Sequence, residues 1–144
     1  MKVRITVTEL SHEDLVDILS TALYDCPYLA VTYNRKTWAE IPEDKKEGDC
    51  FEDHLADMLL NSHWLKVIDC YADGELHTKR KHFVDPILDN EGNGVYFLSR
   101  QDLLWACSSQ RGFALLDELL SGRGDYFTAN NLLQIALFGE EIYG

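Results

Sequence analysis

The sequence lacks several features that would place it in a familiar class of protein. It has no run of about 18 apolar residues, so we expect no helix that crosses a bilayer and no membrane partner. Residues 1–10 mix charged, polar and apolar side chains, unlike the apolar stretch of a secretory signal. The four cysteines form no C-x-x-C pair, and a chain of 144 residues does not need disulfides to stabilise its core. We therefore expect a cytoplasmic protein with reduced thiols.

Basic residues are scarce as well. Lys and Arg number 13, whereas Asp and Glu number 25, which gives a net charge of −12. A field of this sign repels nucleic-acid phosphates, so we expect no direct binding of nucleic acid. The same charge either serves solubility alone or attracts a partner with a basic surface.

Hydrophobic residues make up 46% of the chain, enough for one core, and we predict a single domain over residues 1–144. Patterns of apolar and polar residues predict strands over 3–8, 28–33, 64–71, 75–84 and 95–97. Helices are expected to begin at Ser11, Asp49, Ser99, residue 111 and Thr128, and the last helix to end at Gly139. Asp73-Gly74 is typical of a two-residue hairpin, so the strands on either side of it should pair. The order predicts an α+β fold with a small, mostly antiparallel sheet and about five helices, largely on one face.

Sequence motifs of known catalytic sites are absent, since neither G-x-S-x-G nor H-E-x-x-H occurs. We therefore predict no catalytic residues, no metal and no cofactor. One alternative is a small ligand- or metal-binding protein, or an enzyme, that uses Cys50 and His54. These two residues lie four apart on a predicted helix, where they could share a zinc ion or form a nucleophile pair, although zinc needs further ligands. A self-assembling accessory protein that forms oligomers is a further alternative.

Two other features allow more than one interpretation. The basic residues of segment 77–82 would either grip a phosphate or an acidic partner, or protect an edge strand from pairing with other chains. Trp38 lies in the long polar segment 34–48, where it would serve as an exposed anchor for a partner or pack at the edge of the core.

Both ends of the chain carry stretches that resemble one family. These are Ile5–Thr8 with Asp14–Leu23 near the N-terminus, Leu98–Leu104, and the ending Leu133–Gly144, with the sequence LQIALFGEEIYG. They are similar to small uncharacterised proteins encoded by phages and integrative elements of gut bacteria. The middle departs from that family, which has a shorter loop before the second helix. The resemblance implies a mobile-element setting and no particular chemistry.

Together, these observations favour a non-enzymatic binding protein of a phage or mobile element. Small acidic proteins of such elements often block host machinery, and some present carboxylates at the spacing of DNA phosphates. We hypothesise an inhibitor of a host defence system, such as an anti-CRISPR-like protein or another nuclease inhibitor that mimics DNA. Its partner would be a host protein with a basic surface, such as a nucleic-acid-binding effector. The candidate contact residues are Glu13, Asp14, Asp17, Glu43, Asp44, Glu47, Asp49, Glu52, Asp53, Asp57 and Trp38.

Overall fold

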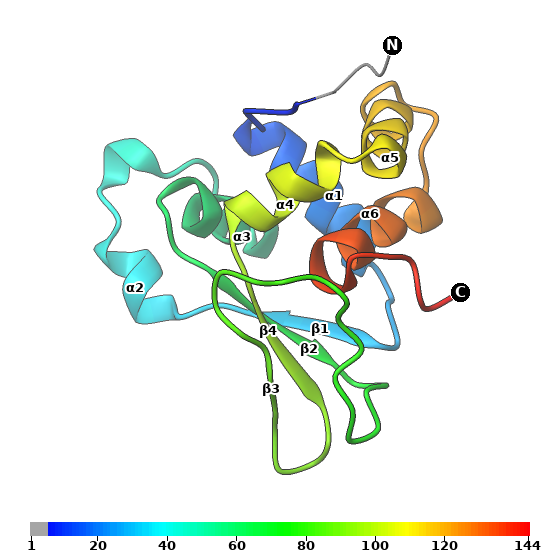
Figure 1. The fold of residues 1–144 in the computed structure, drawn as a ribbon. Helices are drawn as coiled ribbons and strands as arrows, with labels where there is room; N and C mark the ends of the chain where they lie inside the picture. The colour runs from blue at the N-terminus through cyan, green and yellow to red at the C-terminus, as the bar shows by residue number, and fades with distance from the viewer. Residues whose placement is uncertain (1–5) are drawn as a thin grey trace.

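The computed structural model describes residues 6–144, and within them four strands form one antiparallel sheet. The strands are β1 (Leu29–Thr32), β2 (Leu65–Asp69), β3 (Ile87–Leu88) and β4 (Gly94–Leu98). They lie in the order β1-β2-β4-β3, so β2 and β4 occupy the centre. Figure 1 shows the helices gathered on one side of this sheet. The predicted α+β fold with an antiparallel sheet is therefore confirmed.

Six helices of the described chain cover the sheet, and α6 is the one that is most fully buried. They are α1 (His12–Leu23), α2 (Arg35–Glu40), α3 (Phe51–Leu60), α4 (Arg100–Cys107), α5 (Gln110–Leu120) and α6 (Tyr126–Phe138), with a 3₁₀ turn η1 (Glu43–Lys45). Helix α6 packs against α1, α4 and α5 and is buried along most of its length. A helix that is apolar on nearly all sides is typical of the centre of a core. Within the described residues, no helix has the length and apolar character needed to cross a membrane.

Helix ends show which local signals were reliable. Ser11 and Ser99 form the predicted caps of α1 and α4, each paired with an Asp three residues later in a capping box. Gly139 ends α6 with a φ of 84°, as expected of a residue in the left-handed region. The cap of α3 is Cys50 rather than Asp49, because Asp53 reaches back to the Cys50 N–H.

Three further predictions about the elements were wrong. Asp125, not Thr128, caps α6, since its carboxylate accepts from the Thr128 N–H. Segment 34–48 is not a plain loop, because Asn34 caps α2 within it and η1 follows. No strand spans residues 6–8, and the rest of the predicted strand 3–8 lies outside the described residues.

The predicted hairpin at Asp73-Gly74 was also wrong in its pairing. The two residues do turn the chain, with φ values of 52° and 79°, but residues 75–84 form no strand. Instead β2 pairs with β1 and with β4, for example through Val67 opposite Val31 and Tyr96. Segment 75–84 packs against α4 and α6, where its side chains find buried partners that a surface strand would lack.

Candidate functional site: an acidic surface on helices α1 and α3

The predicted contact carboxylates lie on neighbouring segments that His12 connects. Helices α1 and α3 pack against each other, and His12 at the start of α1 reaches toward α3. Its Nδ1 lies 3.3 Å from Glu47 Oε2, and its Nε2 lies 3.4 Å from Asp57 Oδ1 and 3.7 Å from Asp53 Oδ1. We call these four residues the His12 cluster. The cluster joins α1, α3 and segment 46–50 into one structural unit.

Asp57 is the buried centre of this unit. Asp57 is only 1% exposed, and its Oδ2 accepts a hydrogen bond from Trp38 Nε1 at 3.1 Å. Its Oδ1 accepts from the Glu47 backbone N–H, also at 3.1 Å. Burial of a carboxylate is tolerated when such donors satisfy its oxygens. Asp57 therefore positions the acidic segment and is not available to touch a partner.

Trp38 is packed inside this arrangement. Its ring stacks on His54 at 3.6 Å between centroids, and Lys46 Nζ lies 4.0 Å from the ring centroid on a cation–π contact. With its indole N–H donated to Asp57, Trp38 is half-buried. Of the two interpretations of Trp38, the geometry favours packing at the edge of the core over an exposed anchor.

Segment 46–50 is held against α3 because its backbone lies close to the Asp53 carboxylate. Gly48 has a φ of 79°, and a Cβ at this position would lie 2.1 Å from Asp53 Oδ2. Asp53 Oδ2 in turn accepts from the Cys50 N–H at 3.2 Å. Only glycine fits here without strain or collision, so the acidic segment has a defined conformation.

The ten candidate acids divide into two groups of five by what they touch. Five act within the fold: Asp14 and Asp53 in capping boxes, Glu43 with Lys46, Glu47 with His12, and Asp57 as described. The other five form no side-chain hydrogen bond or ion pair with any residue from 6 to 144; they are Glu13, Asp17, Asp44, Asp49 and Glu52. Glu52 is half-buried and the other four are exposed. We call these five the free acids, because they have no polar partner among the described residues; Glu43 and Glu47 are also exposed, but each has one.

Cys50 and His54 do not form the paired site that their spacing allowed. Cys50 caps α3 with its backbone N–H donated to Asp53 Oδ2, and His54 Nδ1 lies 2.6 Å from the Tyr33 hydroxyl. Within the part of the chain that the structure describes, no group of three or more His, Cys, Asp or Glu side chains could hold a metal ion. The geometry gives no support to zinc at this pair.

The basic segment 77–82 is not a strand, so its interpretation as a protected edge strand was wrong; Lys79 and Lys81 are exposed, whereas Arg80 and His82 are turned inward. Arg80 Nη1 lies 3.1 Å from Asp102 Oδ1 and donates to the Ala136 carbonyl at 2.8 Å. The His82 Nε2 lies 2.7 Å from the Leu137 carbonyl. Burial lowers the pKa of His82, although the nearby Asp102 carboxylate opposes this effect. Arg80 and His82 thus fasten segment 75–84 to the end of α6.

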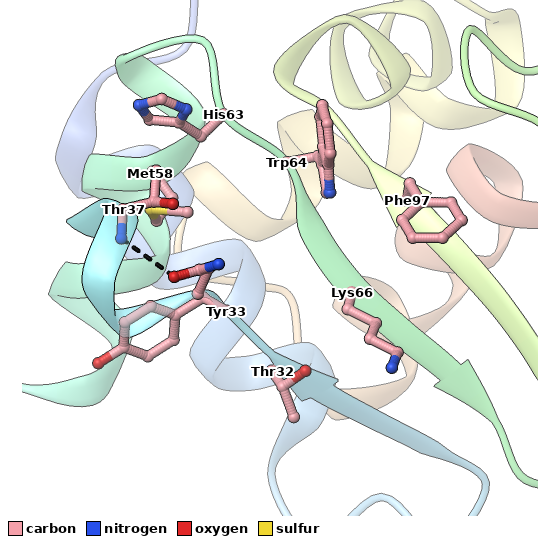
Figure 2. A pocket seen from close by; sticks show the side chains of 9 residues that line it. Thr32, Tyr33, Thr37, Met58, His63, Trp64, Lys66 and Phe97 are labelled. Carbon is pink, nitrogen blue, oxygen red and sulfur yellow. Dashed lines mark hydrogen bonds between the residues drawn. The ribbon is translucent and has the colours of Figure 1, made fainter.

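A cleft that the sequence did not suggest lies beside the outer face of the sheet. It has a volume of about 380 Å³ and is lined by Thr32, Tyr33, Asn34, Thr37, Met58, His63, Trp64, Lys66 and Phe97. Figure 2 shows Trp64 and Phe97 on one side, Tyr33, Met58 and His63 on the other, and Lys66 and Thr32 lower in the view. A volume of this size is in the range of ligand sites in proteins. The one available signal was the alternation of Trp64 and Lys66, which places both side chains on the same face of β2.

Comparison of the chain with models of protein families, with curated protein sequences and with solved structures gives no match. A function must therefore be inferred from the charges and contacts of this chain.

Proposed function

We propose that this chain is a non-enzymatic binding protein that docks onto the basic surface of a partner protein. The docking surface consists of the five free acids on α1, η1 and the start of α3. The observation that supports this most directly is the division of the acids, since five exposed or half-buried carboxylates form no side-chain hydrogen bond or ion pair with residues 6–144. They sit on segments that Asp57 and the His12 cluster hold in place.

A fixed backbone makes these carboxylates effective in binding. A surface that is already ordered loses little conformational entropy when a partner docks, so more of the interaction energy appears as affinity. The net charge of −12 also attracts a basic partner from a distance and speeds encounter. Both effects depend on charge and weaken as salt is added.

The partner we propose is a host nucleic-acid-binding effector in the cytoplasm. A groove built to bind phosphates offers clustered Lys and Arg, and carboxylates on a rigid support can occupy the same positions. The resemblance of both chain ends to proteins of phages and integrative elements is consistent with an inhibitor of host defence. A protein that mimics DNA in this way needs no catalytic residue.

Capture of the partner from a lysate of the native host, followed by mass spectrometry, tests this proposal. The test variant is Asp17→Lys with Asp44→Lys and Asp49→Lys, one change in each of the three segments. The matched control is Glu75→Lys with Asp85→Lys and Glu91→Lys, which are exposed acids elsewhere. Both variants have the same net charge, so a general charge effect would weaken both.

We expect capture of a basic protein by the wild type and by the control, with loss of capture by the test variant. Equal capture by all three proteins would contradict the proposal. Equal loss in both triple variants would show that net charge matters but that these segments do not.

A further inference from the structure

A second surface, chemically opposite to the acidic one, lies around Trp64. This ring lines the cleft of Figure 2 and also a second hollow of about 220 Å³. Both hollows are lined by His63, Trp64 and Phe97, and the second also by Phe83 and Arg100. We call the two hollows together the Trp64 groove.

Large aromatic side chains are left in water along this groove. Trp64 is 54% exposed and Phe83 is 93% exposed, whereas Phe97, on β4, is half-buried. Trp64 and Phe97 meet edge to face, with 6.3 Å between their centroids. Contiguous exposed apolar surface of this kind marks a place where another molecule binds.

The walls of the groove are built on ordered elements. Lys66 and Phe97 face each other across β2 and β4, and Thr32 adjoins Lys66 from β1. The His63 N–H donates to the Met58 carbonyl at 2.9 Å, which fixes the chain just before Trp64. The groove is therefore formed before any ligand arrives.

The charges of the groove indicate what it accepts. Lys66 lies in the first hollow and Arg100 in the second, and neither forms an ion pair within the described 6–144 range. Six of the eleven Lys and Arg side chains in residues 6–144 form no ion pair, and Lys66 and Arg100 are the two of these that line the groove. A ligand that is both apolar and acidic would bury the aromatic rings and neutralise Lys66 and Arg100 at once.

We propose that the Trp64 groove binds an acidic segment of a partner protein that places one large apolar side chain in each hollow. Its carboxylates lie beside Lys66 and Arg100. The occupant is a protein segment because the two hollows share one wall, so a continuous chain can fill both. This inference does not depend on the proposed role of the acidic surface, because that surface would bind a basic partner, whereas the groove would bind an acidic segment.

A phage-displayed library of random short peptides, selected on the immobilised full chain, provides the probe. We expect selected peptides to combine Asp or Glu with Trp, Phe or Leu. Their affinity should fall about tenfold or more on Trp64→Ala and on Lys66→Glu, since a central aromatic and a desolvated cation dominate such sites. The matched control Lys45→Glu makes the same charge change on the exposed η1 turn and should leave affinity within about twofold.

Three results would overturn this proposal. They are a library that yields no enriched sequence, peptides that are basic or lack acids, and binding that is indifferent to both Trp64→Ala and Lys66→Glu. Light scattering over a dilution series covers another occupant, because dimers abolished by Trp64→Ala would make the groove a contact between copies. The triple variant at Asp17, Asp44 and Asp49 should bind the peptides normally, so failure here and failure of the acidic surface are distinguishable.

Discussion

Replacement of Asp57 by Asn tests whether a buried carboxylate organises the acidic surface. Asp57 accepts hydrogen bonds from Trp38 Nε1 and from the Glu47 N–H, one on each oxygen, and is approached by His12. Asparagine keeps one acceptor oxygen but turns an NH₂ group toward the other donor. Each bond to the charged group is worth about 1.5–3 kcal/mol, and a buried donor left unpaired costs a similar amount.

We therefore expect Asp57→Asn to lower the free energy of unfolding by about 2–3 kcal/mol. For a chain of this size that corresponds to a fall in Tm of about 4–12 °C. Urea unfolding followed by tryptophan fluorescence measures the loss, and the NMR signal of the Trp38 indole N–H should shift. Asp44→Asn removes a charge from an exposed side chain and should change stability by no more than about 0.5 kcal/mol. An Asp57→Asn protein as stable as the wild type, with an unmoved Trp38 signal, would refute this reasoning.

Two further predictions concern other supports of the fold. Gly48→Ala should destabilise the protein by about 2–3 kcal/mol, from left-handed strain together with displacement of the capping carboxylate of Asp53. Gly74 has a similar φ, but a Cβ there would meet no other atom, so thermal unfolding of Gly74→Ala should show a loss of stability of only about 1 kcal/mol. Equal losses of stability in the two variants would contradict the collision of a Cβ at position 48 with Asp53. Burial lowers the pKa of His82 below its ordinary value of 6.5, so on acidification the unfolded chain takes up this proton first. The free energy of unfolding should therefore fall as the pH drops below 6.5, and urea titrations should show a smaller fall in His82→Gln; an identical pH dependence in both proteins would contradict this assignment.

Local signals in the sequence predicted some elements correctly, although the caps expected at Asp49 and Thr128 were misplaced. Ser11 and Ser99 begin helices because each has an acid three residues later that completes the cap, and both partners lie within one turn. The strand around Val67 follows from alternating side chains, one set buried and the other exposed. These features need no information from distant parts of the chain.

Pairing and burial could not be predicted in the same way. Segment 75–84 has the composition of a return strand, but Arg80 and His82 find Asp102 and the end of α6, both far away in the sequence. The choice of β4 as the partner of β2 likewise depends on contacts across the fold. A strand pattern cannot show which distant partner will satisfy a buried charge.

The acidic surface was predicted as a set of residues but not as an arrangement. No pattern of residues indicated that Asp57 would be buried or that Trp38 would donate to it, because both contacts depend on how segment 34–50 folds back on α3. The Trp64 groove was missed because its walls come from β1, β2, β4 and the ends of helices. Charge can be counted along a chain, whereas a hollow exists only after folding.

The salt dependence of partner binding is the most direct test of the central claim that exposed carboxylates of α1, η1 and α3 recognise a basic surface. Once a partner has been captured, its Kd should be measured over a range of salt concentrations for the wild type and the two triple variants. We predict that wild-type affinity weakens steeply with salt, that reversal at Asp17, Asp44 and Asp49 costs about tenfold or more and flattens this dependence, and that the control behaves as the wild type. An affinity that is unaffected both by salt and by reversal of these charges would contradict the claim.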